Sequence, residues 1–410
     1  MGYVVVGASA AGINAVQKLR ELKPDASITL ISKDEFIYSR CILHHYLESI
    51  RDIPQLSFVE PDFIDKNRID WKSGVGVESI NTVEKTLTLT DSQTISYEKL
   101  LLATGASTFF PPIPGLRETE NVVGLRNLED AQFIKEKAKD SKNIIVIGAG
   151  LVGIDAVAGL LHTSVKITMI ETQNRMLPMQ LDEKAAKTYQ EAFQNAGLVQ
   201  YYETKVESVA ANKDGRVESI QLSSGVQLDC DLVIVAAGVR ANVDYLKETP
   251  IEVDKYGLVF GAFGQTNVPD IYGAGDVSGR MPIWPAAVKE GIIAASNMAG
   301  HLIEMTDFFA SKSTMNFLGI ATMSLGSPYP PDETFTVDEM KDNRGNYKKI
   351  IHKDGIIHGA IIQGDLSYTG VLTQIIKEKI PIHKIEKPIF EIDYSDFFTQ
   401  TGSLQFKYTT

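Results

Sequence analysis

The stretches YVVVGASAAG, residues 3–12, and NIIVIGAGLVG, residues 143–153, each place a glycine-rich turn directly after a short apolar strand. A segment rich in Ala, Val and Ile follows each turn and is expected to form a helix. Such a turn lets the backbone approach a pyrophosphate, and the helix N-terminus offers free N–H groups and the positive end of its dipole. One such pattern is weak evidence, whereas two in one chain predict two dinucleotide sites. We therefore expect one flavin and one nicotinamide cofactor, with a hydride passing between them.

The composition is that of a soluble globular protein of two or three domains. The chain has 410 residues, of which 44% are hydrophobic and 22% charged. A formal net charge of −12 argues against nucleic-acid binding. The absence of a long apolar run and a start almost directly in a strand predict no membrane span, no signal peptide and a cytoplasmic location. The only cysteines, Cys41 and Cys230, exclude a disulfide framework and fit no metal site.

The first glycine-rich unit departs from the usual fingerprint at two positions. Ser9 replaces the middle glycine, and Ser32 ends the second strand where an acidic residue usually binds the ribose. Lys33 and Asp34 follow Ser32. We interpret this turn as a nucleotide site, and a tight structural turn between strand and helix is the alternative.

Five motifs occur in order along the chain: GASAAG at 7–12, LLLATGA at 100–106, VIGAGLVG at 146–153, LVIVAAGVRAN at 232–242 and TNVPDIYGAGDV at 266–277. Over roughly residues 1–305 the chain resembles the pyridine nucleotide-disulfide oxidoreductase superfamily. This resemblance implies an α/β fold with two Rossmann-like dinucleotide-binding domains and a small α+β C-terminal domain. It implies an FAD-binding domain at 1–110 and 241–305, an NAD-binding domain at 111–240 and a C-terminal domain at 306–410.

The resemblance also implies that Asp276 binds the ribityl chain of FAD, with an exposed turn aspartate as the alternative. Arg40 is a candidate anchor for the flavin or its pyrophosphate. Trp284, at the start of a predicted helix near Pro285, either stacks near the flavin or packs as a staple. The expected FAD contacts are Gly7, Ser9, Ala11, Gly12, Ser32, Lys33, Arg40, Val77, Ala103, Thr104, Gly105, Asp276, Val277 and Trp284.

The second glycine-rich unit keeps all three glycines, and its second strand, VKITMIE, ends in Glu171. A carboxylate there binds ribose hydroxyls and repels a 2′-phosphate, which favours NADH over NADPH. Arg175, four residues later, is near enough to weaken that preference. Asp155 stands where relatives carry a glutamate near the nicotinamide or flavin ring; the alternative is a first-turn acid that stabilises the helix dipole. The expected NAD contacts are Gly148, Gly150, Leu151, Val152, Gly153, Asp155, Glu171 and Gly238.

The segment EFIYSRCILHHYL, residues 35–47, holds one cysteine, which excludes the CxxxxC dithiol of glutathione-type enzymes. YSRCIL fits the YxRPxL frame that resembles NADH:rubredoxin oxidoreductases and the flavin portion of nitrite reductases, with Cys41 in the proline place. A redox thiolate at Cys41, held by Arg40 and the neighbouring histidines, is the alternative, and a small half-buried residue is another. Adjacent His44 and His45 would point to different helix faces, so no metal site is expected. Cys230 is expected in the core.

The C-terminal part contains a predicted β-hairpin at 346–365 with an Asp-Gly turn, followed by a helix within 369–382. It resembles the small C-terminal domain of the rubredoxin-reductase and nitrite-reductase group and lacks an HPxxxE acid-base pair. We expect an FAD- and NADH-dependent oxidoreductase that reduces a small rubredoxin-type or iron-sulfur protein, or a partner subunit as in phenylglyoxylate dehydrogenase. The alternatives are a Cys41-dependent coenzyme A-disulfide reductase or NADH oxidase, and a non-catalytic redox-sensing protein. A homodimer is left open.

Overall fold

The first sheet is built around β1 (Tyr3–Val6), the strand that ends at the first glycine-rich turn. Its strands are all parallel, in the order β18-β7-β1-β2-β3. The other strands of this sheet are β2 (Ile28–Ile31), β3 (Asp70–Lys72), β7 (Lys99–Leu102) and β18 (Ile271–Gly273). The computed structural model describes residues 2–306, 312–382, 387–402 and 405–408.

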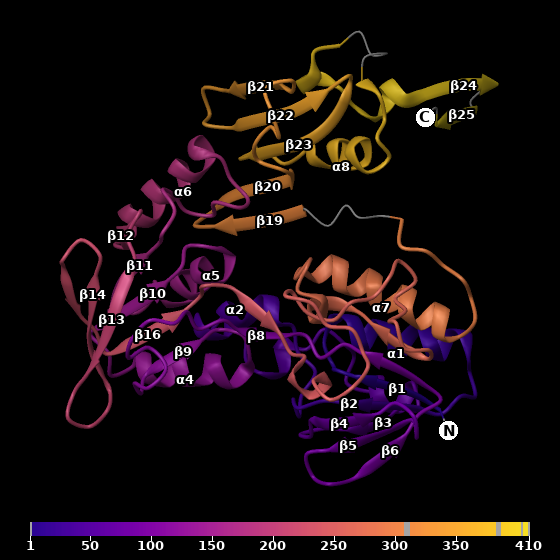
Figure 1. The fold of residues 1–410 in the computed structure, drawn as a ribbon. Coiled ribbons are helices and arrows are strands. Elements are labelled where there is room, and N and C mark those ends of the chain that lie inside the picture. The colour runs from indigo at the N-terminus through magenta and orange to yellow at the C-terminus, as the bar shows by residue number, and fades with distance from the viewer. Residues whose placement is uncertain (1, 307–311, 383–386, 403–404, 409–410) are drawn as a thin grey trace.

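Two layers cover this sheet because side chains alternate along each strand. Val5 faces helices α1 (Ala10–Leu22) and α7 (Trp284–Met298), which lie side by side in Figure 1. Val4 and Val6 face the antiparallel strands β4 (Val77–Asn81), β5 (Thr86–Leu89) and β6 (Thr94–Ser96). Residues 77–96 therefore form a three-stranded antiparallel meander.

The second sheet repeats this plan around β10 (Asn143–Ile147), with parallel strands in the order β12-β11-β10-β16-β9. Its other strands are β9 (Val122–Gly124), β11 (Lys166–Ile170), β12 (Val199–Tyr201) and β16 (Leu232–Val235). One face packs against helices α4 (Leu128–Ala138), α5 (Leu151–Leu160) and α6 (Glu183–Asn195). The other packs against the antiparallel strands β13 (Val206–Ala211), β14 (Val217–Leu222) and β15 (Gln227–Asp229).

Short elements join the two parallel-sheet domains. Strands β8 (Ala106–Thr108) and β17 (Val239–Ala241) pair antiparallel. Helix α2 (Leu43–Leu47) leaves the first domain and packs against α4 and α5 of the second, whereas α3 (Phe63–Lys66) stays with the first core. Four 3₁₀ turns also lie in this region: Arg40–Ile42, Pro54–Leu56, Asp244–Leu246 and Gly275–Ser278.

The C-terminal domain is an antiparallel sheet of strands β19 (Lys312–Phe317), β20 (Ile320–Gly326), β23 (Ile356–Gln363), β22 (Tyr347–Lys353) and β21 (Thr336–Lys341), in that order. One face packs on α8 (Thr369–Lys377), where Ile362 is buried; the other packs on α6, where Ile361 is buried. Figure 1 shows this domain seated next to α6. The chain continues through the 3₁₀ turns Ile389–Glu391 and Tyr394–Phe397 to strands β24 (Phe398–Gly402) and β25 (Gln405–Tyr408).

The predicted fold class is confirmed: two Rossmann-like parallel-sheet domains and a C-terminal antiparallel domain with a helix. The predicted hairpin has its turn at Asp354 and Gly355, whose φ angles are 51° and 78°. A two-residue Asp-Gly hairpin turn requires positive φ at both residues. Helix α7 begins at Trp284 with Pro285 in its first turn, as the sequence predicts. Within the described residues no helix is both long and apolar enough to cross a membrane.

Candidate functional site

A cavity of about 410 Å³ lies at the carboxyl ends of β1, β2, β7 and β18. Residues that directly follow these strands line it, among them Gly7, Ser32, Ala103 and Ala274. This is the edge at which open parallel sheets bind ligands. The cavity also takes in residues of the linking segments, including Arg40, Cys41 and Arg126. It therefore spans the junction between the two parallel-sheet domains.

The glycines of the first turn serve close backbone packing. A Cβ on Gly7, whose φ is 116°, would lie 2.0 Å from the Ala103 carbonyl oxygen, and a Cβ on Gly12 would lie 1.8 Å from the Gly7 carbonyl oxygen. Ser9 is the N-cap of α1 with φ of −112°, which any L-residue adopts, so the missing middle glycine is tolerated. The first turn of α1 holds no acidic residue, and its N–H groups face a site suited to an anion.

Most of the residues expected to contact FAD lie on the wall of the cavity. These are Gly7, Ser9, Ala11, Ser32, Lys33, Arg40, Val77, Ala103, Thr104, Gly105, Asp276 and Trp284. Gly12 and Val277 do not line it: Gly12 packs α1 against the turn, and Val277 is fully buried in the core beneath. Their place in the sequence motif reflects packing within the domain.

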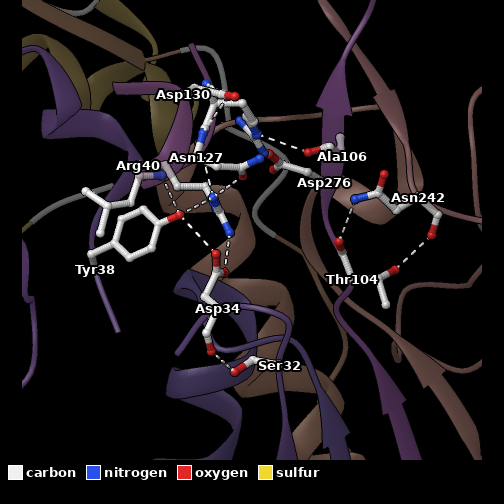
Figure 2. Close-up of polar contacts among 12 residues, drawn as sticks. Ser32, Asp34, Tyr38, Arg40, Thr104, Ala106, Asn127, Asp130, Asn242 and Asp276 are labelled. Carbon is white, nitrogen blue, oxygen red and sulfur yellow. Dashed lines mark hydrogen bonds and ion pairs between the residues drawn. The ribbon is translucent and has the colours of Figure 1, made fainter. Parts of the chain in front are cut away.

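Arg40 is held by a network on the cavity wall, which Figure 2 shows. Its guanidinium pairs with the Asp34 carboxylate at 2.6 Å and donates to the Tyr38 hydroxyl at 2.8 Å and to Asn127 Oδ1 at 2.5 Å. The Ser32 hydroxyl donates to the Asp34 carbonyl oxygen at 2.7 Å and accepts from the indole N–H of Trp71 at 2.9 Å. Arg40 thus ties the first domain to the N-cap of α4, and Ser32 is committed to internal hydrogen bonds.

Arg126 is a site residue that the sequence reasoning missed. Its guanidinium pairs with Asp276 at 2.5 Å and donates to the Ala106 carbonyl oxygen at 3.1 Å. The next residue, Asn127, caps α4 in a capping box with Asp130. The signal in the sequence was the Asn127-to-Asp130 spacing of a capping box, which marks a helix start directly after Arg126. The Arg126–Asp276 ion pair links the Gly275–Asp276 turn of the first domain to the start of the second domain.

Two further parts of the wall are apolar or hydroxyl-bearing. Trp284 lines the cavity and also packs edge-to-face on Phe58, with ring centroids 4.8 Å apart. The packing role is therefore seen, and stacking near the flavin stays a prediction. The Thr104 hydroxyl donates to the Asn242 carbonyl oxygen at 2.9 Å and lies 3.2 Å from the buried Tyr245 hydroxyl. Asn242 and Tyr245 line the cavity as well, and the sequence reasoning assigned them no role.

Cys41 is exposed to the cavity, but its surroundings do not favour a thiolate. Burial raises the pKa of its thiol, and the carboxylates of Asp155 and Asp276 raise it further, whereas Arg126 lowers it. The predicted support from Arg40 is absent because Asp34 and Asn127 hold that guanidinium. The histidines do not supply it either, since burial lowers the pKa of His44 to about 4 and also lowers that of His45.

Asp155 lies on α5, which packs against α2, and one of its carboxylate oxygens is 3.5 Å from His44 Nδ1. Burial raises the pKa of this carboxyl to about 8. It is the fifth residue of a helix that begins at Leu151 and whose first turn has no acidic residue, so the alternative of a first-turn acid that stabilises the helix dipole does not hold. Asp155 therefore places a carboxyl that is mostly protonated at neutral pH close to Cys41 at the domain junction.

The second glycine-rich turn resembles the first in construction. A Cβ on Gly148, with φ of 107°, would lie 2.5 Å from the Ala236 carbonyl oxygen, and one on Gly153 would lie 2.0 Å from that of Gly148. A Cβ on Gly150, the N-cap of α5, or on Gly238 would meet nothing within 4 Å. Both face open space, which is the arrangement of a backbone that a bound phosphate approaches. Leu151 and Val152 form the start of α5 behind Gly150.

Glu171 follows β11 and is buried, with 8% of its surface exposed. Its carboxylate accepts from the backbone N–H of Ala149 at 2.7 Å, from that of Gln173 at 2.8 Å and from the Thr172 hydroxyl at 3.1 Å. A carboxylate has about four acceptor positions, so it retains acceptor capacity for a ribose hydroxyl. These contacts fix its negative charge beside the glycine-rich turn.

The residues present fit two dinucleotide cofactors. Two helix N-termini without acids stand behind glycine-rich turns, and the open faces of Gly105, Gly150 and Gly238 leave room for ligand atoms. Within the described part of the chain, no cluster of three or more His, Cys, Asp or Glu residues is placed to hold a metal ion. The fold and site are those of a two-dinucleotide flavoprotein.

The chain belongs to the pyridine nucleotide-disulphide oxidoreductase family, whose model matches residues 1–291. A second model, the rubredoxin NAD+ reductase C-terminal domain, matches residues 312–380. Members of this family use FAD and NADH, so the cofactors predicted from the sequence are confirmed, as is the chain's place among NAD(P)H-dependent oxidoreductases.

Individual relatives cover most of this chain. It is 29% identical to the epsilon subunit of NADH-dependent phenylglyoxylate dehydrogenase from Aromatoleum evansii, over 91% of both chains. It is 28% identical to nitrite reductase [NAD(P)H] from Bacillus subtilis over 94% of its own length, and it spans only 48% of that protein. A solved ferredoxin reductase from Rhodopseudomonas palustris shares the fold, with a TM-score of 0.85, 22% identity and coverage of 95% of this chain and 98% of the other.

Proposed function

We propose that this chain carries electrons from NADH through FAD to a small one-electron carrier of the rubredoxin or iron-sulfur type, or to a partner subunit of a larger oxidoreductase. FAD supplies the necessary chemistry when bound, because a flavin accepts a hydride and releases electrons singly. The residues of this chain bind and orient the cofactors and set the charge around them.

The observation that carries the proposal is the single thiol in the cavity. A dithiol relay to a disulfide substrate needs two cysteines at the flavin, and this chain has only Cys41 there. Cys230, the other cysteine, is 4% exposed in the core of the second sheet, and burial raises the pKa of its thiol to about 12. Without an internal thiol relay, electrons leave the flavin for an external acceptor.

The C-terminal domain supports a protein acceptor. The family model that matches it is named for rubredoxin reductases, and the solved neighbour is a ferredoxin reductase. One similar curated chain is the epsilon subunit of a larger dehydrogenase, and the other is a nitrite reductase of which this chain spans 48%. A soluble carrier and a partner subunit are thus two kinds of protein that could accept electrons from the same flavin.

The contacts support the following roles for particular residues in this proposal. The N-terminus of α1 would hold the FAD pyrophosphate, and Asp276, oriented by Arg126, would bind the ribityl hydroxyls. The N-terminus of α5 at Gly150 would hold the NADH pyrophosphate, with Glu171 on the adenosine ribose. Asp155, whose pKa is raised by burial and which lies near Cys41, would stand close to where the nicotinamide meets the flavin.

An anaerobic titration with NADH, followed by mixing with an oxidised carrier, tests this proposal. We expect one equivalent of NADH to bleach the flavin fully, with no long-wavelength thiolate-flavin band. Oxidised rubredoxin or a [2Fe–2S] ferredoxin should then restore the flavin colour, and the cycle should repeat over many turnovers. Failure of NADH to bleach the flavin would contradict the proposal, and bleaching that neither carrier reverses would contradict a soluble carrier as the acceptor.

A Cys41-dependent coenzyme A-disulfide reductase or NADH oxidase is the second candidate, because the Cys41 thiol is exposed to the cavity. The variant Cys41→Ser separates the two candidates. An electron carrier keeps its NADH-to-carrier turnover in this variant. Loss of turnover with coenzyme A disulfide or O₂, with the flavin still bound, would favour the second candidate.

A further inference from the structure

Arg175 is the only basic residue in the loop that joins Glu171 to α6. A cation in this loop is what a Rossmann domain uses to bind the 2′-phosphate of NADP. The position of its guanidinium therefore decides whether this chain offers that phosphate any compensating charge. In this protein the guanidinium is committed elsewhere.

The guanidinium of Arg175 turns back on its own loop. Its Nε donates to the Leu181 carbonyl oxygen at 3.1 Å, Nη2 donates to the Pro178 carbonyl oxygen at 3.1 Å, and Nη1 donates to Asn174 Oδ1 at 2.7 Å. All three acceptors are neutral, so its positive charge is not cancelled by these bonds. They fold the loop into a compact turn around the side chain.

The C-terminal domain covers this guanidinium. The ring of Tyr329, in the segment between β20 and β21, lies under it with the guanidinium carbon 5.0 Å from the ring centroid. Tyr329 also lies near the start of α6, where the backbone N–H of Glu183 lowers the pKa of its hydroxyl against the larger raising effect of burial. One tyrosine thus contacts the arginine and lies beside the helix that follows its loop.

We propose that Tyr329 is a specificity-determining residue, which holds Arg175 against its own loop and thereby denies a cation to the 2′-phosphate of NADPH. Discrimination against NADPH then has two parts: the Glu171 carboxylate repels the phosphate, and Tyr329 withholds the charge that would offset this repulsion. The inference rests on the proposed binding of the adenosine ribose at Glu171.

The physical basis is the competition between the ring and water. Stacking over an aromatic face holds a guanidinium in one orientation, and Arg favours such sites because its planar group is weakly hydrated. Without the ring, the remaining bonds are made within a loop that is buried at Leu181 and exposed at Met179, whose side chain is 78% exposed. Water competes for the exposed acceptor, Asn174 Oδ1, whereas a phosphate offers a bidentate, charge-assisted partner.

The test compares the binding of ADP-ribose and of 2′-phospho-ADP-ribose to the FAD-loaded protein by calorimetry. We expect Tyr329→Ala to improve the relative affinity for the phosphorylated probe by about tenfold, the worth of one charge-assisted hydrogen bond. Tyr329→Phe keeps the ring and is expected to match the wild type. The kcat/KM ratio of NADPH to NADH with an artificial acceptor should move in parallel.

Arg175→Gln provides the matched control. Alone, it should change the relative affinity less than about twofold, because the guanidinium does not reach the phosphate in the wild type. Combined with Tyr329→Ala, it should remove the gain entirely. If the alanine variant folds poorly, Tyr329→Leu replaces it. Leucine keeps bulk but has no π face, so this variant should show the gain expected of Tyr329→Ala.

The outcomes separate this inference from the proposed function. Normal ADP-ribose binding with no gain in either ring-removed variant overturns the inference alone. A loss of 2′-phospho-ADP-ribose affinity in Arg175→Gln also overturns it, because Arg175 would then already contact the phosphate. Failure of the wild type to bind ADP-ribose overturns the proposed function together with the inference.

Discussion

Asp182 forms a buried ion pair with Lys349 at the junction of the second sheet domain and the C-terminal domain. Its Oδ2 accepts from Lys349 Nζ at 3.0 Å and from the Tyr347 hydroxyl at 2.7 Å, and its Oδ1 accepts from the Ala185 N–H at 3.0 Å. The two charged side chains are only 6% and 7% exposed. Burial alone would raise the pKa of Asp182, but these hydrogen bonds outweigh it and the pKa is lowered.

Lys349→Met should strongly destabilise this junction. The substitution keeps an unbranched side chain, one heavy atom shorter, but leaves the Asp182 carboxylate buried without its counter-charge. Removing one partner of a buried pair costs roughly 3–5 kcal/mol. Because two neutral donors remain on Asp182, we expect the lower end, about 3 kcal/mol.

Urea denaturation followed by far-UV circular dichroism measures this cost. Both tryptophans, Trp71 and Trp284, lie in the first sheet domain, so their fluorescence reports that domain separately. The variant should lower the midpoint of the circular dichroism transition and leave the fluorescence transition nearly unchanged. Near-coincident shifts of both signals would show that the three domains unfold as one unit.

Asp182→Asn/Lys349→Met is the control, because removing both charges avoids the uncompensated carboxylate. It should recover more than half of the lost stability. The pair's contribution should be present above the unfolded pKa of Asp182, 3.8, and should fade as the pH falls through the lowered folded value. A cost below about 1 kcal/mol in the single variant, the value typical of exposed pairs, would refute the reasoning.

Three further predictions concern the cofactor sites. Gly150→Val should weaken NADH binding at least about tenfold with little change in the stability of the NADH-free protein. The valine side chain would enter space that is open only for the ligand. NADH titration measures the first effect and thermal melting the second. Arg126→Met should lower the FAD content of the purified protein, since it leaves Asp276 unpaired; the ratio of flavin to protein absorbance checks this, and Arg126→Lys should retain more FAD. Asp155→Asn should flatten the decline in stability between pH 4 and about 8. A carboxyl whose folded pKa is raised from 3.8 to about 8 stabilises the protonated, low-pH folded state and loses that contribution as the pH rises. Melting temperatures across this range measure the slope, and an unchanged slope would contradict the prediction.

The sequence by itself determined the two dinucleotide turns. Gly7, Gly12, Gly148 and Gly153 sit where any Cβ would strike a carbonyl oxygen within 2.5 Å, so the constraint is local and appears as glycine at fixed spacing. The Asp354–Gly355 hairpin was readable for the same reason, since both residues adopt positive φ. The family and its cofactors followed from these local signals.

Only the tertiary structure decided how the side chains between the domains are engaged. Arg40 is adjacent to Cys41 in sequence, yet its charge is taken by Asp34 and Asn127, the second of which comes from 87 residues away. Arg126 meets Asp276 across 150 residues, and Arg175 is covered by Tyr329 from another domain. Which partner such long, flexible side chains choose depends on the packing of distant segments, and no local pattern encodes it. The charges that set thiol pKa and nucleotide choice are therefore properties of the assembled fold.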